Sequence, residues 1–386
     1  MFKEDLQTLA QQHLLRELSL LNSPSAPVIS VEGREFLLFA SNNYLGLANH
    51  PQVKLAAMKA IEGFGVGTGA SRLISGTLTL HHNLERDLAQ FKGVEASLTF
   101  SSGYATNIGV IPRLAKSGAL ILADRLCHAS LIDGCRLSRA TLRVFHHNDL
   151  DHLKRLLSKQ PTHASTLIIT EGVFSMDGDL APLPEMARLA EEFEATLLVD
   201  DAHGTGVMGT TGRGTVEHYG LNPGRLLHMG TLSKAIGSSG GFVAGPKDFV
   251  SYLINTSRSF IYTTAPPPAM AAAASAALAI IQQEPQRKTK LWRNRELLHK
   301  GLVAMGFQLT KTQSPILPII VKDPELGVQM SHRLREEGVW IPAVRPPTVP
   351  KGTSRLRVTV TADHSLEQIE TVLRALQKVG TALKVL

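Results

Sequence analysis

One lysine of this chain stands in a setting that favours covalent chemistry. Lys234 follows a short apolar run in LLHMGTLSKAIGSSGGFVAG and lies between small hydroxyl residues and a glycine-rich segment. A lysine in such a place can lose its proton, approach an aldehyde and form a Schiff base. Taken alone this pattern is weak, because most lysines are solvated surface residues.

An acid and a histidine follow a second apolar run upstream. Residues 196–199 predict a buried strand, and Asp200 and His203 come at its carboxyl end in TLLVDDAHGTGVMG. Ligands of open α/β sheets bind at that end of the strands. A carboxylate for a pyridine nitrogen and a lysine for an aldehyde together predict pyridoxal 5′-phosphate (PLP) as the cofactor. His203 can donate to the phenolic oxygen of its ring, and Thr231 can reach its phosphate.

The segment SSGYATN predicts a phosphate-binding helix start. A strand candidate runs into a helical segment through small hydroxyl residues and Gly103. Free N–H groups and the helix dipole favour an anion at such a place, and Tyr104 would lie close to the cofactor ring. The alternative is an ordinary capped helix without a ligand.

Two loop residues follow further predicted strands. His128 in ADRLCHASLIDG can cover one face of a cofactor ring, although a lone loop histidine is more often a surface group. Ser175 in TEGVFSMDGD can hydrogen-bond near the ring oxygen, whereas the Asp177–Asp179 segment favours a turn.

Two arginines alternate in SRLRVTVTADHS near the C-terminus. Arg355 and Arg357 therefore share one face of a predicted strand. One of them can hold a substrate carboxylate with two parallel hydrogen bonds, and the alternative is a pair of solvated arginines. Upstream, the rigid proline loop AVRPPTVPKG can shape a pocket for an extended acyl chain.

The elements that must position these residues alternate between strand and helix. This order predicts an α/β fold with a doubly wound, mostly parallel sheet. The strand candidates are residues 96–100, 119–123, 167–170, 196–199 and 226–229. The pattern changes after a long helical segment near 269–284, which predicts an N-terminal arm (1–50), a large PLP-binding domain (51–285) and a smaller C-terminal α+β domain (286–386).

Bulk composition narrows the class of protein. The chain has 386 residues and a formal net charge of +7, with basic residues scattered rather than clustered. Scattered charge argues against nucleic acid as a partner. It suits a small polyanionic substrate or an acidic carrier protein, or serves only solubility. Two cysteines, no signal-like start and no apolar stretch of membrane length predict a cytoplasmic protein without a membrane segment.

Taken together, the motifs resemble those of the α-oxoamine synthases. These are fold-type-I PLP enzymes that condense an amino acid with an acyl thioester. The resemblance runs in family order from about residue 39 to residue 364 and rests on SNNYLGL, GTGASRLISGT, SSGYATN, LCHASLIDG, TEGVFSMDGD, VDDAHGTG and TLSKA. One departure is Asn43, where the family usually has Asp.

The resemblance implies a role for each of several residues. Lys234 would carry the cofactor and Asp200 would hold its pyridine nitrogen, while His128 would stack on the ring. Around the cofactor it places Gly103, Tyr104, Ser175, His203 and Thr231. For substrate it implies Arg357 at the amino-acid carboxylate, with Arg16 and Thr348 as further contacts.

The resemblance also implies substrates and an assembly. EGVFSMDGD, VRPPTVP and RLRVTVTADH are most similar to family members that join L-alanine to a pimeloyl thioester, either pimeloyl-CoA or pimeloyl-acyl carrier protein. The alternatives are a relative that uses glycine or L-serine, and a non-catalytic subunit with the same fold. Family members are homodimers with composite active sites, which implies that Thr263 and Thr264 reach the neighbour's cofactor.

Overall fold

The computed structural model describes residues 2–159 and 165–386. The chain divides into two compact units. Unit 1 comprises Met1–Asn49, Ser175–Asp179 and Gln286–Leu386, and unit 2 comprises His50–Phe174 and Leu180–Pro285. The segment predicted as an arm therefore belongs to the same unit as the C-terminal part of the chain.

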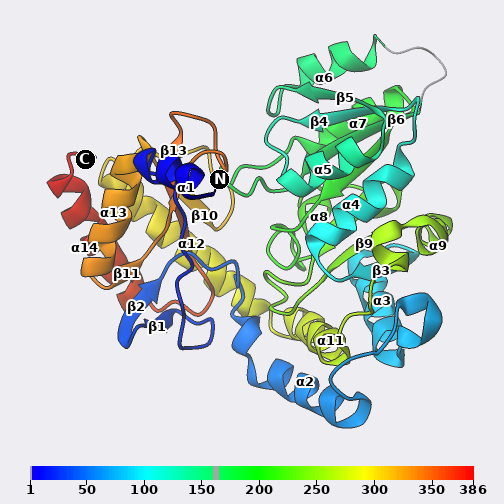
Figure 1. The fold of residues 1–386 in the computed structure, drawn as a ribbon, viewed down its shortest axis with the longest axis horizontal. Coiled ribbons are helices and arrows are strands. Elements are labelled where there is room, and N and C mark those ends of the chain that lie inside the picture. The colour runs from blue at the N-terminus through cyan, green and yellow to red at the C-terminus, as the bar shows by residue number, and fades with distance from the viewer. Residues whose placement is uncertain (1, 160–164) are drawn as a thin grey trace. The chain divides into compact units, whose positions relative to one another are not determined.

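Unit 2 is built on a seven-stranded sheet with the order β3-β9-β8-β7-β6-β4-β5 (Figure 1). Five strands from β5 to β8 in this order run parallel to their neighbours, and β9 is antiparallel to both β8 and β3. The predicted α/β class with a mostly parallel sheet is thus confirmed. The strands are β3 (Ala96–Phe100), β4 (Leu120–Asp124), β5 (Thr141–Phe145), β6 (Thr166–Glu171), β7 (Thr196–Asp200), β8 (Leu227–Thr231) and β9 (Gly241–Gly245).

The strand candidates missed β5 and β9, each for a physical reason. β5 lies at the sheet edge, and only Phe145 of its five residues is buried, so it lacks an apolar run. β9 begins and ends with glycine and follows GSSG, which is typical of a loop. Its glycine start is required by close packing, because a Cβ on Gly241 would lie 2.7 Å from the backbone nitrogen of Gly103.

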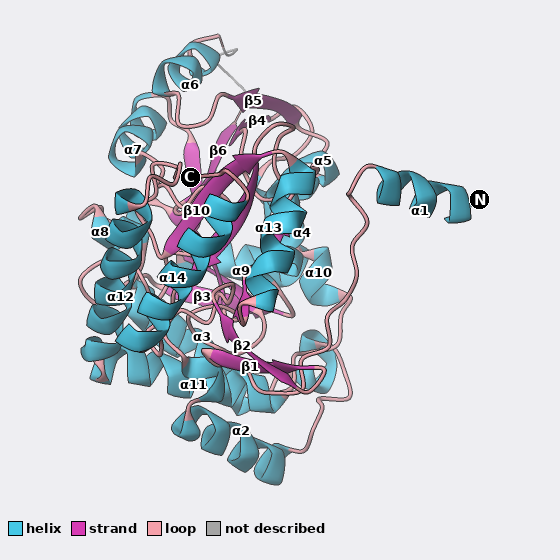
Figure 2. Cartoon of the chain, turned by 90° about the vertical axis from the view of Figure 1, so that its left-hand side faces the viewer, coloured by secondary structure: helices cyan, strands magenta, loops and turns pink. Residues whose placement is uncertain are grey.

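Helices of unit 2 cover both faces of this sheet (Figure 2). Helices α6 and α7 pack on one face, and α4 and α5 pack side by side on the other. The helices are α2 (Pro51–Phe64), α3 (Thr79–Lys92), α4 (Gly103–Leu114), α5 (Ala129–Leu137), α6 (Leu150–Leu157), α7 (Leu183–Glu192), α8 (Thr215–His218), α9 (Lys247–Thr256), α10 (Arg258–Ile261) and α11 (Pro268–Gln283).

Unit 1 contains two three-stranded sheets with helices. In one sheet β2 pairs with β1 and β11, and in the other β13 pairs with β10 and β12. The strands are β1 (Val28–Val31), β2 (Arg34–Leu38), β10 (Ile316–Lys322), β11 (Val339–Trp340), β12 (Ala343–Val344) and β13 (Ser354–Thr359). The helices are α1 (Phe2–Gln11), α12 (Pro285–Ala304), α13 (Pro324–Glu336) and α14 (Leu366–Ala382).

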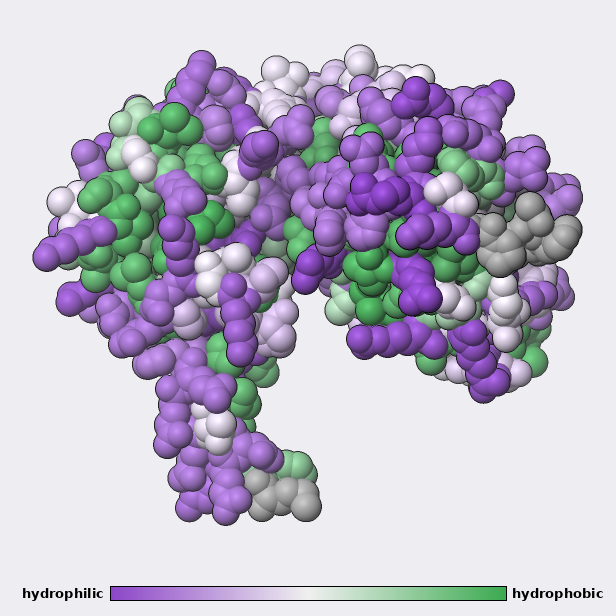
Figure 3. All heavy atoms as spheres, turned by 90° about the horizontal axis from the view of Figure 1, so that it is seen from above, coloured by the Kyte–Doolittle hydropathy of each residue, from purple (hydrophilic) through white to green (hydrophobic). Residues whose placement is uncertain are grey.

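The N-terminal helix is shorter than its leucine pattern predicts. Leucines recur in this segment to Leu18 at near-helical spacing, but α1 ends at Gln11 and none of its residues is buried. Short helices are stabilised mainly by packing of an apolar face against the rest of the protein, and α1 lacks such packing. Leucines of this segment stay at the surface, and Figure 3 shows hydrophobic side chains between hydrophilic ones on the face that it draws. Among the described residues, no helix is long and apolar enough to cross a membrane.

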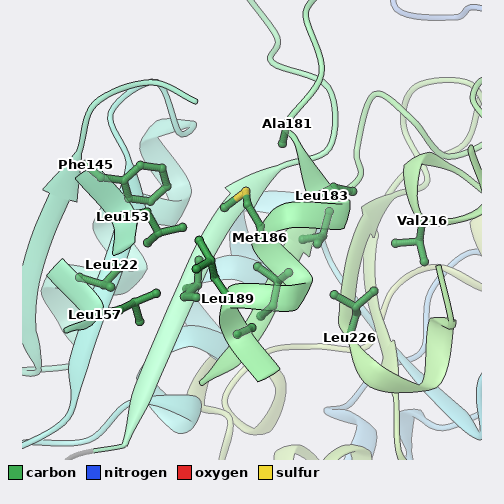
Figure 4. Packing of buried hydrophobic residues seen from close by; sticks show 14 of the residues in the cluster. Leu122, Phe145, Leu153, Leu157, Ala181, Leu183, Met186, Leu189, Val216 and Leu226 are labelled. Carbon is green, nitrogen blue, oxygen red and sulfur yellow. The ribbon is translucent and has the colours of Figure 1, made fainter. Parts of the chain in front are cut away.

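The core of unit 2 explains why its central strands are apolar throughout. Along β6, Ile168 points to the side of α6 and α7, while Leu167 and Ile169 point to the side of α4 and α5. Figure 4 shows the first of these clusters, in which Leu153 of α6 and Met186 of α7 meet side chains of the sheet. Strands buried on both faces need apolar residues at successive positions, which is why they could be predicted.

Acid should destabilise the fold through buried imidazoles. His364 is fully buried, and its Nδ1 accepts the Thr361 N–H at 2.9 Å while its Nε2 lies 3.0 Å from the Leu38 carbonyl oxygen. Burial lowers the pKa of His364 to about 4, and it lowers the pKa of His228 to about 4 as well. Between the ordinary value near pH 6.5 and pH 4, the unfolded chain binds more protons than the native chain, so stability falls as pH falls.

We expect protonation of each imidazole to lower the free energy of unfolding by about 2 kcal/mol between pH 7 and pH 5. Urea unfolding at the two pH values measures the loss. His364→Gln should reduce the pH dependence, and His82→Gln, at an exposed histidine, should leave it unchanged. An equal pH dependence in wild type and His364→Gln would contradict the assignment.

Candidate active site

The carboxyl ends of the parallel strands bring polar residues to one edge of the unit 2 sheet. β6 ends at Glu171, β7 at Asp200 and β8 at Thr231. Glu171 is the register partner of Asp200, and Asp200 is the partner of Met229 in β8. Lys234 follows Thr231 by three residues in the turn that leads to β9. The edge thus carries the residues that the sequence predicts for the cofactor.

Asp200 is a buried carboxylate with capacity for a further donor. Its side chain is held by the Asn107 amide nitrogen, 3.0 Å from Oδ2, and by the Ala202 N–H, 3.0 Å from Oδ1. Asp200 itself is 5% exposed. An ionised carboxylate offers about four lone-pair sites. Asp200 can therefore accept another N–H, such as that of a protonated pyridine nitrogen.

The neighbouring acid, Asp201, has a structural role. Its carboxylate forms a buried ion pair with Lys92 at 3.0 Å and accepts the Thr215 hydroxyl at 2.8 Å. Gly204 packs against it so closely that a Cβ there would lie 2.0 Å from Asp201 Oδ1. Because successive strand residues point to opposite faces, two adjacent acids at one strand end serve different purposes.

The loop around Lys234 is fixed by Thr231. The Thr231 hydroxyl donates to the Gly240 carbonyl oxygen at 2.9 Å and lies 2.7 Å from the Ser233 hydroxyl. Lys234 is half-buried, and its carbonyl oxygen accepts the Gly237 N–H at 2.9 Å. This loop holds the lysine at the end of a buried strand rather than on a mobile surface segment.

The first turn of α4 lies beside the same loop. Ser102 caps the helix by accepting the Ala105 N–H at 3.0 Å, and Gly103 begins it. A Cβ on Gly103 would lie 3.6 Å from the Thr231 hydroxyl oxygen. The N–H groups of this turn and the helix dipole suit a phosphate group.

The hydroxyl of Tyr104 has a partner of its own. It donates to the Asp133 carboxylate, and this hydrogen bond raises the pKa of the exposed Tyr104 phenol. The hydroxyl is therefore directed at the neighbouring helix α5, whereas the predicted approach of the Tyr104 ring to the cofactor stays a prediction.

His128 lies within electrostatic reach of both Asp200 and Lys234. It caps α5, and its backbone N–H donates to Glu171 Oε1 at 2.6 Å. Although His128 is partly exposed, protein atoms around its imidazole lower its pKa by desolvation. The Asp200 charge raises that pKa and the Lys234 charge lowers it. Three residues predicted from separate motifs thus act on one another in unit 2.

His203 lies in the turn after β7 and is 5% exposed. Its predicted hydrogen bond to the ring oxygen stays a prediction. The remaining predicted residues belong to unit 1: Arg16, Ser175, Thr348 and Arg357. Their roles are likewise predictions, and their contacts within unit 1 can be described.

Arg357 hydrogen-bonds neutral groups of unit 1. Its Nε donates to the Ser175 carbonyl oxygen at 2.7 Å, and both terminal nitrogens donate to Asn42 Oδ1 at 3.1 Å. Arg355, two residues away, instead forms an ion pair with Asp177 at 2.7 Å. Both arginines are buried, which excludes the interpretation as solvated strand residues. Arg355 has its counter-charge already, so Arg357 is better suited to an anionic substrate group.

Arg16 and Thr348 lie close together in unit 1. Arg16 donates to the Pro346 carbonyl oxygen at 3.3 Å and lies 3.5 Å from the Thr348 hydroxyl oxygen. Both residues are exposed. Two segments far apart in sequence, the N-terminal segment and the proline loop, therefore lie close together, and their contact with substrate stays a prediction.

The motifs did not reveal the polar residues that hold the predicted ones. Asn107 of α4, Ser130 of α5 and Asn42 each hydrogen-bond a predicted site residue. All three stand inside quoted motifs, and for Asn107 and Asn42 a polar residue on the buried side of a helix or loop was the available signal. Ser130 had none, since a serine in the first turn of a helix is common.

The donor set in unit 2 fits PLP. Asp200 can accept the pyridine N–H, Lys234 offers an amine for the aldehyde, and the first turn of α4 offers N–H groups for the phosphate. Among the described residues, the side chains of His146, Asp149 and His152 lie close enough to share a metal ion. His152 Nδ1 already accepts the His146 N–H at 3.2 Å, and Asp149 caps α6, so we assign them a structural role.

Comparison with known proteins agrees with this geometry. The family model for class I and II aminotransferases matches residues 34–376. The 8-amino-7-oxononanoate synthase of Lysinibacillus sphaericus is 44% identical, over 98% of this chain and 97% of that protein. The enzyme of the same name from Geobacter sulfurreducens is 46% identical, over 98% and 97%. The chain belongs to the 8-amino-7-oxononanoate synthase family.

Solved structures agree with the family. A serine palmitoyltransferase from S. paucimobilis with bound PLP and myriocin superimposes with a TM-score of 0.95 at 34% identity, covering 100% of this chain and 98% of that one. An 8-amino-7-oxononanoate synthase from Francisella tularensis gives a TM-score of 0.78 at 28% identity, over 90% and 98%. The predicted fold-type-I architecture, the PLP cofactor and the class of acyltransferase are thereby confirmed.

Proposed function

We propose that this chain joins L-alanine to a pimeloyl thioester and forms 8-amino-7-oxononanoate for biotin biosynthesis. In this reaction the alanine Cα bonds to the acyl carbonyl carbon, the thiol leaves, and the carboxyl group departs as CO2. A proton is returned to the former Cα. The observation that carries the proposal is the joint placement of Lys234, Asp200 and His128 in a chain of this family.

The chain's own residues supply binding and proton transfer. When bound, PLP provides an electron sink that stabilises negative charge at the substrate Cα. The Asp200 carboxylate, held by Asn107, would hold the protonated pyridine nitrogen. The Lys234 amine would take the Cα proton and later return it. The N–H groups in the first turn of α4 would hold the phosphate.

The test compares amino acids with a single acyl donor. With pimeloyl-CoA we expect the highest kcat/KM for L-alanine, and mass spectrometry should find 8-amino-7-oxononanoate as the product. The expectation rests on the named relatives and on the VRPPTVP and EGVFSMDGD segments. The structural likeness to serine palmitoyltransferase makes L-serine the second candidate. A higher kcat/KM for L-serine or glycine would overturn the proposal.

Arg357→Ala should weaken binding of the amino acid much more than binding of the acyl thioester. Loss of one partner from a desolvated guanidinium–carboxylate pair costs about 2–5 kcal/mol. Arg355→Ala is the matched comparison, because it removes a buried arginine of the same strand that already pairs with Asp177. Titrations of the PLP absorbance with L-alanine measure both variants.

We expect Arg355→Ala to lower the free energy of unfolding and to change the alanine Kd less than Arg357→Ala does. A larger loss of alanine binding in Arg355→Ala would make Arg355 the carboxylate residue. Unchanged binding in both variants would place the carboxylate elsewhere.

We also propose a homodimer with composite active sites. Exposed apolar side chains in unit 2 support it, among them Met58 (64% exposed), Ile74 (81%) and Tyr262 (72%). Where such side chains form a contiguous apolar surface, that surface marks a protein interface. Thr263 and Thr264 follow Tyr262, and the resemblance to the family implies that they reach the partner's cofactor. Light scattering should give twice the chain mass of 41.8 kDa.

The acyl donor and the location complete the proposal. The net charge of +7 favours an anionic donor, either CoA or an acidic acyl carrier protein, through long-range attraction. Cys127 and Cys135 are buried free thiols, which supports a reducing compartment such as the cytoplasm.

A further inference from the structure

Four polar side chains of unit 2 form a continuous chain of hydrogen bonds. It runs from Asp200 at the end of β7, through Asn107 of α4 and Ser130 of α5, to the His128 imidazole. The links are 3.0 Å from the Asn107 amide nitrogen to Asp200, 2.9 Å from that nitrogen to Ser130 Oγ, and 2.8 Å from Ser130 Oγ to His128 Nδ1. Asn107 is 1% and Ser130 2% exposed, so water does not compete for these links.

The direction of every link follows from the groups involved. An ionised Asp200 carboxylate only accepts, so the Asn107 side chain must present its NH2 group to it. The second N–H of that group donates to Ser130 Oγ. The Ser130 hydroxyl keeps its own proton for another acceptor, and that acceptor is His128 Nδ1.

His128 Nδ1 receives a second donor. The Ser130 backbone N–H points at the same nitrogen at 3.2 Å. A ring nitrogen that accepts from a hydroxyl and an N–H cannot itself carry a proton. The neutral imidazole must then hold its proton on Nε2, and the doubly protonated ring is disfavoured.

We propose that Asn107 and Ser130 are positioning residues that hold His128 as the neutral tautomer with its proton on Nε2. They couple this state to the ionised carboxylate of Asp200. The benefit follows from the proposed places of the two residues, because a neutral imidazole can lie against a positively charged pyridine ring without charge repulsion. The inference rests on the proposed function for that benefit and not for the tautomer itself.

Asn107 keeps an unfavourable unpaired polar atom, which agrees with a positioning role. Its Oδ1 is buried without a hydrogen-bond partner among the described residues. A buried unpaired carbonyl oxygen is unfavourable, so the side chain is not explained by stability alone. Its two N–H donors account for its presence. Desolvation also lowers the pKa of His128, which acts in the same direction.

Nitrogen-15 NMR of histidine-labelled, PLP-loaded protein tests the proposal directly. The two ring nitrogens differ strongly in shift according to which one carries the proton, and His128→Gln identifies the signals by their loss. In the wild type we expect Nδ1 without a proton and Nε2 with one. A wild-type His128 that carries its proton on Nδ1 would overturn the proposal.

Variants test the two positioning residues. Ser130→Ala removes the hydroxyl donor, and we expect the proportion of the Nδ1-protonated form to rise about fivefold. The acidic limb of the kcat/KM profile should move to higher pH, because the neutral ring loses a partner. Ser130→Thr keeps the hydroxyl and should restore the wild-type signals. Asn107→Leu should act in the same direction as Ser130→Ala.

The matched control is Ser138→Ala. Ser138 is a buried serine at the other end of α5, and its hydroxyl donates to the Cys135 carbonyl oxygen. This variant should leave the His128 signals unchanged. His128 signals in Ser130→Ala that equal those of the wild type would refute the role of Ser130. The tautomer is read without any acyl donor, so failure of the L-alanine test and failure of this inference are separate results.

Discussion

Lys234→Ala should abolish turnover while the fold survives. The variant removes the amine that is proposed both to carry the cofactor and to move the Cα proton. Loss of a positioned base alone costs about 10²–10⁴-fold, and loss of the attachment point adds to it. Thr231 and backbone groups hold the loop around the half-buried Lys234, and we expect the variant to fold. The kcat with L-alanine and pimeloyl-CoA measures the effect.

Chemical mapping checks the residue itself. Borohydride fixes the cofactor on the lysine that carries it, and peptide mass spectrometry should find the label on Lys234. Lys311→Ala, at an exposed lysine of unit 1, should keep both activity and label. A label on any other lysine would refute the assignment.

Asp200→Asn should keep the cofactor bound but slow removal of the alanine Cα proton by about 10²–10³-fold. A neutral amide cannot hold the pyridine nitrogen protonated, so the electron sink is weakened. The amide would also turn a donor toward the Asn107 NH2 group, which disturbs that contact. Exchange of the alanine Cα hydrogen with deuterated water, followed by NMR, measures the step without an acyl donor.

Asp201→Asn is the matched control, since it makes the same change one residue along. Asp201 pairs with Lys92 in the interior. Breaking a buried pair on one side costs about 3–5 kcal/mol of stability, so this variant should lower the free energy of unfolding. Its folded fraction should exchange the Cα hydrogen faster than Asp200→Asn does. Near-normal exchange in Asp200→Asn would rule out the role of Asp200.

The fold could be predicted from the sequence wherever burial requires a run of apolar residues. β6 and β7 are covered on both faces, so they are apolar throughout and were found within a residue or two of their ends. β5 was not predicted, because an exposed edge strand needs no apolar run. β9 was not predicted, because close packing against Gly103 requires glycine, a residue that otherwise indicates a loop.

The candidate site was predictable for residues that bear reactive groups and not for residues that hold them. Lys234 and Asp200 stand at strand ends, where chain order alone indicates a ligand. Asn107 and Ser130 act through hydrogen bonds between α4, α5 and β7. Those partners are far apart along the chain, and no local pattern reports them.

The sequence by itself determined the α/β class, the family and the cofactor, and it predicted the lysine and acid that are proposed to serve it. These follow from local order, because motif, strand end and chemical group coincide in short segments. Only the tertiary structure decided which of two adjacent acids is structural, since that depends on Lys92 reaching Asp201 from α3. It likewise decided which of two alternating arginines is paired with Asp177, because Asp177 approaches Arg355 from a distant loop. Such choices depend on long-range packing, which brings together side chains that the sequence keeps apart.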